Sequence, residues 1–207
     1  MSFIPRDLES CNKDLIKFLE NDIYLALKNA SLYMRMKTCL SKRWFGDNSP
    51  FWIHKLRIKH ERLANLIKKQ PIFIDRLTEE HGYYNTNAKA YKPAHGWQDY
   101  TSDEHYDAIM ANPRYFVISL GCSWFDSPIY AVDAHAPSKF QILVHELSHL
   151  FICARDHRYG YNRCILYGMD NSIMAKTNAD SWGYFASACR LHHRTIIDDD
   201  GLESTRM

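Results

Sequence analysis

The chain has 207 residues, of which 46% are hydrophobic and 24% charged, and its formal net charge is +2. Such values are typical of an ordinary globular protein, large enough for one domain or for two small parts around a cleft. A charge so close to zero, without a basic stripe that carries interleaved aromatic residues, argues against a nucleic-acid partner. No apolar run approaches the roughly 18 residues that a membrane span requires.

The N-terminal third predicts two long helices. Over Asp14–Lys37 apolar residues recur at helical spacing, which indicates one buried stripe. The second helix has clear boundaries, because Ser49 can cap it, Pro50 suits its first turn, and the pattern ends after Lys69. Its basic residues and His60 are expected on a solvated face.

The middle of the chain predicts short strands, and a helix with a strong motif follows. From about residue 72 to 113, aromatic residues, Asn, Gly and Pro mix without a long period, which favours loops and short strands. Residues 114–122, RYFVISLGC, are dense in β-branched and aromatic side chains and predict a strand. Ser138 is a candidate N-cap for the motif helix, and a last helix is expected over residues 180–193.

This order of elements, helices first, then strands, then the motif helix, predicts an α+β fold. We expect a mainly helical part over residues 1–113 and a catalytic part over 114–207, packed as one compact unit with a cleft. The N-terminal sequence MSFIPRDLESCNKDLIKFLEND is charged throughout and lacks the apolar core of a signal peptide. We therefore expect that a signal peptide has been removed, that the protein stays inside the cell, or that it leaves by a route needing no such signal, as a bacterial effector or toxin would.

The central motif is His145-Glu146-x-x-His149, within the sequence QILVHELSHLFICARDHRYG at residues 141–160. On a helix, four residues turn through about 400°, so the two imidazoles project from one face, one turn apart. Imidazoles so placed can bind one Zn²⁺ at about 2.0–2.1 Å each, and Glu146 beside them can reach a metal-bound water. A surface helix with two accidental histidines is the alternative. An apolar stripe that anchors the helix and leaves the histidines at a cleft favours a catalytic zinc site.

A catalytic zinc site usually has three protein ligands and one water, so a third ligand should follow. The metzincin pattern requires Gly three residues after the second His and another His beyond it, but these positions hold Ile152 and Arg155. Asp156 and His157 come next. Two adjacent residues on a regular backbone cannot both close the site, and the residues alone leave the choice between them open.

The motif followed by Asp-x-x-Tyr-Gly at residues 156–160 resembles the aspzincins, the family of deuterolysin and peptidyl-Lys metalloendopeptidase. The sequence MAKTNADSWGYFA at 174–186 is similar to the family's Asn-Ala-Asp-x-x-x-Tyr-Phe segment. RWFG at 43–46 and LGCSWF at 120–125 resemble further family positions. The family usually has Gly-Thr before its ligand Asp and a slightly longer spacer, where this chain has CARD.

The resemblance implies a zincin-like α+β fold, with N-terminal helices, a small sheet, the motif helix and C-terminal helices. It implies a protein or peptide substrate and one catalytic zinc ion. The implied metal ligands are His145, His149 and Asp156. Glu146 would then act as the general base, and Tyr159 as the hydrogen-bond donor to the oxyanion.

The resemblance also bears on specificity. In peptidyl-Lys members, acidic residues of the Asn-Ala-Asp segment help to form a pocket for a Lys after the scissile bond. Asp180 matches the first of these residues, and Gly183 stands at the second acidic position. One carboxylate predicts a weaker or broader preference for Lys or Arg. Capping of the last helix is the alternative role for Asp180.

The expected activity is zinc-dependent hydrolysis of peptide bonds by an endopeptidase. A zinc amidase that acts on cell-wall peptide would use the same residues with a different pocket. A non-catalytic, zinc-containing binding module is the second alternative, but it has no chemical need for Glu146 or Tyr159.

Overall fold

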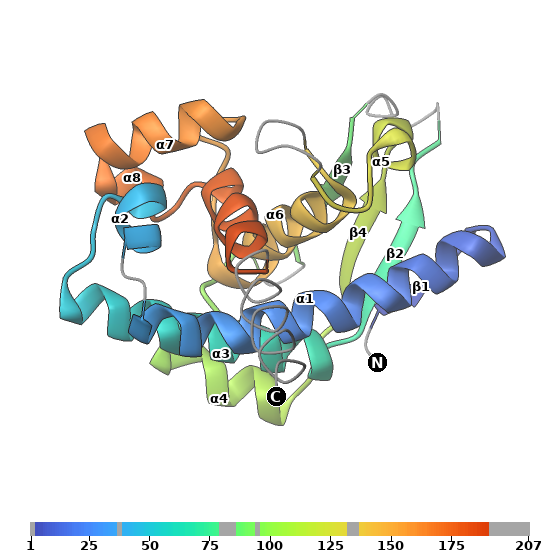
Figure 1. The fold of residues 1–207 in the computed structure, drawn as a ribbon. Helices are drawn as coiled ribbons and strands as arrows, with labels where there is room; N and C mark the ends of the chain where they lie inside the picture. The colour runs from blue at the N-terminus through green and yellow to red at the C-terminus, as the bar shows by residue number, and fades with distance from the viewer. Residues whose placement is uncertain (1–2, 37–38, 79–85, 94–95, 132–136, 191–207) are drawn as a thin grey trace, which may run out of the picture.

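The computed structural model describes residues 3–36, 39–78, 86–93, 96–131 and 137–190 (Figure 1). The strands are β1 (Phe3–Pro5), β2 (Ile72–Arg76), β3 (Ala88–Ala90) and β4 (Phe116–Leu120). The helices are α1 (Ser10–Met36), α2 (Cys39–Phe45), α3 (Pro50–Lys69), α4 (Asp103–Ala111), α5 (Cys122–Asp126), α6 (Lys139–Ile152), α7 (Tyr161–Asp170) and α8 (Ser172–Ala175). Residues 179–190 form the last described helix.

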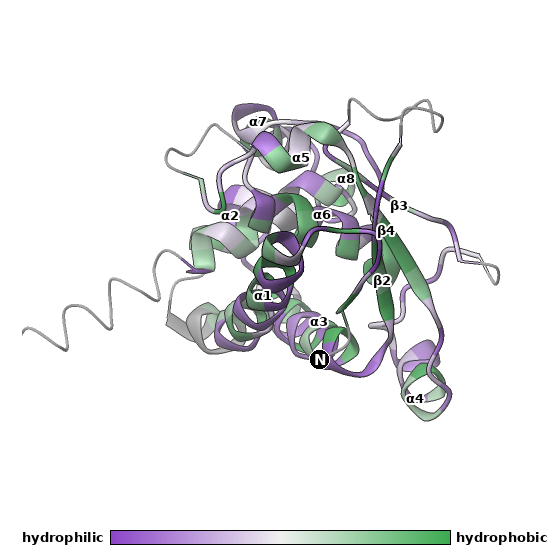
Figure 2. Ribbon diagram, turned by 90° about the vertical axis from the view of Figure 1, so that its right-hand side faces the viewer, coloured by the Kyte–Doolittle hydropathy of each residue, from purple (hydrophilic) through white to green (hydrophobic). Residues whose placement is uncertain are grey.

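The four strands form one mixed sheet in the order β1-β2-β4-β3. β1 and β4 run parallel to β2, whereas β3 pairs with β4 in the antiparallel direction and places Ala90 opposite Ile118. One face of the sheet is buried, and Figure 2 shows α1, α3 and α6 on a single side of it. The sheet takes three strands from residues 1–113 and β4 from the rest of the chain. β3 is therefore the edge strand that lies beside α6.

The two N-terminal helices confirm the predictions and add one correction. α3 begins where expected, since the Ser49 hydroxyl oxygen accepts the Trp52 N–H at 3.3 Å. The expectation for His60 was wrong, because this side chain is fully buried. Position 60 follows Leu56 by one turn and so belongs to the apolar stripe of α3. Its ring packs between Trp182 at 5.1 Å and Phe185 at 5.0 Å.

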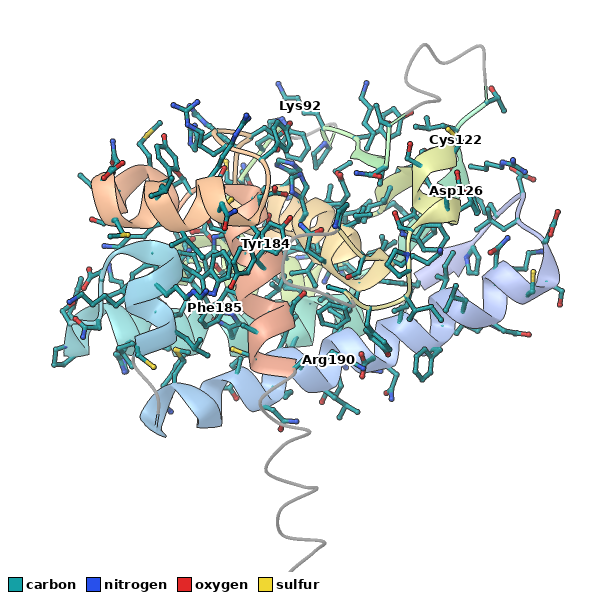
Figure 3. The ribbon with its side chains drawn as sticks, turned by 45° about the horizontal axis from the view of Figure 1, so that its top comes forward. Lys92, Cys122, Asp126, Tyr184, Phe185 and Arg190 are labelled. Carbon is teal, nitrogen blue, oxygen red and sulfur yellow. The ribbon has the colours of Figure 1, made fainter. Side chains whose placement is uncertain are left out.

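The last described helix is held on both sides. Phe185 packs against Phe45 of α2 with ring centroids 5.2 Å apart, and Arg190 donates to Asp22 of α1 at 2.7 Å (Figure 3). The predicted helix over residues 180–193 is thus confirmed as far as residue 190, and its end lies outside the described residues. The helix spans the gap between the N-terminal helices and α6.

Several short helices escaped prediction. α4 lies within residues 72–113, where only loops and strands were expected, although β2 and β3 confirm the strands. α2 and α7 were also missed.

The chain just after α2 packs closely against α7. Gly46 has φ +66°, and a Cβ on it would lie 2.0 Å from the carbonyl oxygen of Gly168. Only glycine fits both this conformation and this contact. Among the described helices, none combines the length and the hydropathy that a bilayer span would need.

His60 predicts how stability depends on pH. Its Nδ1 donates to the Leu56 carbonyl at 2.7 Å, and burial lowers its pKa from 6.5 to about 4. As the pH falls from about 6.5 toward 4, the unfolded chain binds a proton that the folded chain does not. The free energy of unfolding contributed by His60 is therefore complete above pH 6.5 and declines below it.

Replacing His60 with Leu should make the free energy of unfolding less sensitive to acid. Between pH 7.5 and 4.5, the loss of unfolding free energy should be smaller by about 2 to 3 kcal/mol in the variant than in the wild type. Urea unfolding at the two pH values and equal zinc measures this difference. The matched control is His54→Leu, an exposed position on the same helix. An unchanged pH dependence in His60→Leu would contradict the prediction.

Candidate active site

Helix α6 is positioned by its ends and by its burial. The Ser138 hydroxyl oxygen accepts the Gln141 N–H at 3.2 Å, so the predicted N-cap is confirmed. Every residue of α6 except His149 is buried. The helix ends at Cys153, which adopts the left-handed conformation with φ 58° and ψ 32°. The chain therefore reverses at once, and the next residues return toward the histidine face.

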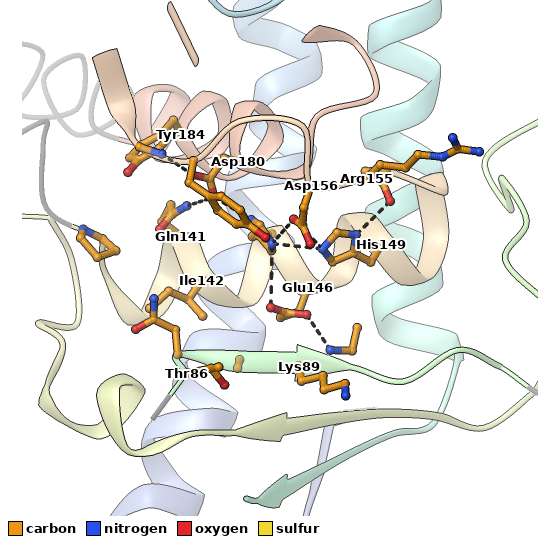
Figure 4. A pocket seen from close by; sticks show the side chains of 18 of the residues that line it. Thr86, Lys89, Gln141, Ile142, Glu146, His149, Arg155, Asp156, Asp180 and Tyr184 are labelled. Atoms are coloured by element: carbon orange, nitrogen blue, oxygen red, sulfur yellow. Dashed lines mark hydrogen bonds and ion pairs between the residues drawn. The ribbon is translucent and has the colours of Figure 1, made fainter. Parts of the chain in front are cut away.

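Three side chains converge above α6 (Figure 4). The Nε2 atoms of His145 and His149 are 3.0 Å apart, and Asp156 Oδ1 lies 3.2 Å from the first and 3.3 Å from the second. In the part of the chain that the structure describes, this is the group of His, Cys, Asp or Glu side chains able to hold a metal ion. His157 points elsewhere, since its Nε2 lies 3.1 Å from the Thr177 hydroxyl.

The outer nitrogens of both imidazoles are fixed by acceptors. His145 Nδ1 donates to Asp180 Oδ1 at 2.6 Å, and His149 Nδ1 donates to the Ala154 carbonyl at 2.9 Å. The Nε2 atoms therefore face the Asp156 carboxylate. Three such atoms attract a cation, and their spacing matches the roughly 3.3 Å edge of a tetrahedral zinc site with bonds of about 2.0–2.1 Å. The donor set fits zinc.

The charged groups of this cluster shift one another's pKa values. Burial alone would lower the pKa of His145, but hydrogen bonds with Asp156 and Asp180 raise it to about 10. Burial would raise the pKa of Asp156, yet hydrogen bonds with His145 and His149 hold it well below its usual range. Without a metal ion, protons on the imidazoles thus supply the positive charge that the carboxylates require. A metal ion must displace these protons in order to bind.

The side chain of Glu146 extends from α6 to the edge of the sheet. Its side chain is 6% exposed, and its Oε2 accepts the Ala90 N–H of β3 at 2.6 Å. Its Oε1 is 3.9 Å from His145 Nε2 and so faces the cluster. Burial raises the pKa of Glu146, while the nearby charges of His145 and His149 partly offset that effect. A carboxylate with a raised pKa binds a proton more readily than an exposed one.

The loop that carries Asp156 is held from beneath by the Asn-Ala-Asp segment. The Asn178 side-chain oxygen accepts the N–H groups of His157 at 3.0 Å and Arg158 at 2.9 Å. Asp180 Oδ2 accepts the Gly160 N–H at 2.7 Å. Asn178 was not predicted as a functional residue. Its place in the segment at 174–186 was the available signal.

Tyr159 and Asp180 complete the surroundings of the cluster. The Tyr159 ring is 57% exposed and lies nearly parallel to the His145 ring, with centroids 6.2 Å apart. Burial and the charge of Asp156 both raise the pKa of the Tyr159 phenol, which keeps its O–H as a donor. Asp180 is 7% exposed and accepts hydrogen bonds with both oxygens. Its role in binding substrate stays a prediction.

A cavity of about 1080 Å³ opens over the cluster. Its walls come from β3, from Trp97, from the histidine face of α6 and from the loop that leads to Gly160. Asp180 and Tyr184 line it as well. A cavity of this size accommodates several residues of an extended peptide over the cluster of His145, His149 and Asp156.

A mixed α+β fold with two imidazoles and a carboxylate converging in a cleft defines a metal-dependent hydrolase. The family model described as lysine-specific metallo-endopeptidase, the aspzincins, matches residues 73–187, more than half of the chain. The chain belongs to this family. It is a zinc-dependent metalloendopeptidase, as the sequence predicted. The family match does not favour the amidase or the binding module.

The fold is similar to a solved structure, the zinc peptidase from Grifola frondosa. The TM-score is 0.62, and the match covers 87% of this chain and 96% of that chain at 16% sequence identity. At this identity the similarity concerns the fold. No curated protein matches the sequence significantly.

The charge arrangement predicts the titration of His145 in zinc-free protein. Its imidazole should remain protonated up to a pH of about 10. Asp156→Asn removes one of the hydrogen bonds that raise this pKa, so the titration midpoint should move down. Imidazole chemical shifts followed by NMR across the pH range measure both midpoints. A wild-type midpoint below 7 would contradict the charge arrangement described above.

The hydrogen bonds of Asn178 predict its effect on zinc binding. Asn178→Ala leaves two loop N–H groups without their acceptor and should weaken zinc affinity roughly 10- to 100-fold. Competition with a chromophoric chelator measures the affinity. Asn171→Ala is the matched control, because Asn171 caps α8 by accepting the Met174 N–H at 3.1 Å. Equal affinities in the two variants would show that the loop keeps its position without Asn178.

Proposed function

We propose that the zinc ion of this endopeptidase binds at His145, His149 and Asp156, and that α6 is the active-site helix. The observation that carries the proposal is the convergence of two Nε2 atoms and one carboxylate oxygen at 3.0 to 3.3 Å. Zinc, when bound, acts as a Lewis acid that polarises the scissile carbonyl and lowers the pKa of water. His157 plays no part in the metal site.

Glu146 serves as the general base. Its Oε1 faces the cluster while its Oε2 is held by the Ala90 N–H, so one oxygen is free to accept a proton in a fixed direction. Glu146 takes a proton from the attacking water and passes it to the amine that leaves. Burial raises the pKa of Glu146 and so makes its carboxylate a stronger proton acceptor than an exposed one.

Tyr159 donates a hydrogen bond to the oxyanion that develops on the scissile carbonyl. Its position beside His145 at the mouth of the cavity and its retained phenol proton support this role. Gly160, the residue after Tyr159, is held by the hydrogen bond that its N–H donates to Asp180. Tyr159 thereby keeps a defined position, although its ring is largely exposed.

Asp180 has two roles in this proposal. It orients His145 through Nδ1 and so keeps Nε2 available to the metal. Its negative charge at the cavity wall also favours Lys or Arg in the substrate position after the scissile bond, in keeping with the description of the family. Because both oxygens already accept hydrogen bonds, the preference for a cationic side chain is modest.

The Glu146→Gln variant tests the mechanism. It should lower kcat by roughly 10²- to 10⁴-fold, the contribution typical of general acid–base catalysis. Zinc content, measured by metal analysis, should stay at one ion per chain. Wild type and variant are compared on a denatured protein mixture, with new N-termini read by mass spectrometry. Cuts of equal frequency by both proteins would remove Glu146 from the mechanism.

A further inference from the structure

The part of the cavity beyond His145 has a wall that includes a polar side chain, Gln141, to which the proposed mechanism gives no role. Four side chains on that side are Gln141, Ile142, Asp180 and Tyr184 (Figure 4). They come from the first turns of α6 and from the last described helix. The substrate residue after the scissile bond would meet this wall, according to the proposed function on which the present inference rests.

Gly183 allows the last described helix to lie close to Gln141. A Cβ at position 183 would lie 2.9 Å from the Gln141 carbonyl oxygen and 3.0 Å from its Nε2. The last described helix therefore lies directly against the start of α6. No side chain at position 183 can reach the cavity while Gln141 keeps its place. The amide of Gln141 occupies the space that a side chain at 183 would need.

The Gln141 amide is poorly satisfied where it lies. The side chain is 3% exposed, and its Nε2 donates to Asp180 Oδ1 at 3.3 Å, near the long limit of such bonds. Its Oε1 is buried and has no hydrogen-bond partner within the described ranges of the chain. A buried acceptor without a donor is unfavourable, so a ligand that supplies an N–H is favoured there.

Asp180 is less available than Gln141 to accept a hydrogen bond from a ligand. Its Oδ1 accepts from His145, and its Oδ2 accepts from Gly160. An N–H group that enters this part of the cavity thus finds in Gln141 an acceptor with spare capacity. The terminal amide torsion of a glutamine is soft, so rotation about it can bring Oε1 to the cavity once the long contact between Nε2 and Asp180 is released.

We propose that Gln141 determines specificity by accepting a hydrogen bond from the side chain that follows the scissile bond. A neutral acceptor requires an N–H but no positive charge. The enzyme therefore cleaves before Gln and Asn as well as before Lys and Arg. Side chains of similar size without a donor, Leu and Met, leave the Gln141 oxygen unpaired and are disfavoured.

The test compares wild type and Gln141→Met, each loaded with zinc, on peptides that differ only at this position. For the wild type, kcat/KM before Gln should lie within about tenfold of that before Lys, and roughly tenfold above that before Leu. In Gln141→Met the ratio of Gln to Leu should fall about tenfold, mainly through KM. Ile142→Val is the matched control, because it changes the same wall without a polar atom and should keep the ratio.

Gln141→Glu is the second variant and decides the matter if Gln141→Met does not fold. A carboxylate in this place should raise the ratio of Lys to Gln about tenfold. An unchanged profile in either folded variant would overturn the role of Gln141. A wild type that cleaves without regard to this position would overturn it too. The absence of any cleavage, with zinc bound, would instead refute the proposed function itself.

Discussion

The candidate site depends on the hydrogen bond between Asp180 and His145 Nδ1. Two imidazole nitrogens and a carboxylate oxygen converge within 3.3 Å, and such groups hold a fixed geometry only when the surrounding structure imposes it. Asp180 fixes the first imidazole and, through the Gly160 N–H, the loop that returns from Asp156. One side chain thus joins α6, the loop and the last described helix.

The packing around α6 and the last described helix holds the contact between Asp180 and His145 in place. α6 lies with one side against the sheet edge and another against the N-terminal helices, so 13 of its 14 residues are buried. The last described helix is pinned by Arg190 to α1 and by Phe185 to α2. A site built on buried helices keeps its geometry better than one carried by loops, and the one loop involved is tied by Asn178.

The sequence predicted those helices whose start or exposed face depends only on residues close together in the chain. The side chains of Ser49 and Ser138 cap the starts of α3 and α6. Helical spacing alone places both motif histidines on one face of α6. His60 was misplaced because its polarity outweighed its position on the apolar stripe. α4 was missed because nine residues give little periodicity.

The choice between Asp156 and His157 is a matter of tertiary structure. The left-handed turn at Cys153 and the hydrogen bonds of Asn178 direct Asp156 into the cluster and His157 toward Thr177. No helical or strand periodicity encodes such a turn. The hydrogen bonds that Asn178 and Asp180 accept from the loop at residues 157–160 join positions 20 or 21 residues apart, so the sequence indicated the Asn-Ala-Asp segment but not these contacts.

The bond from Ala90 to Glu146 has a consequence for the sheet as well as for the cleft. An exposed edge strand presents unpaired N–H and C=O groups that can recruit a strand of another molecule. β3 is three residues long, and its Ala90 N–H is already taken by Glu146. The Glu146 carboxylate, which faces the cluster of His145, His149 and Asp156, therefore also occupies one hydrogen-bonding position of this edge, so a single bond both orients the carboxylate and leaves one N–H fewer to recruit another strand.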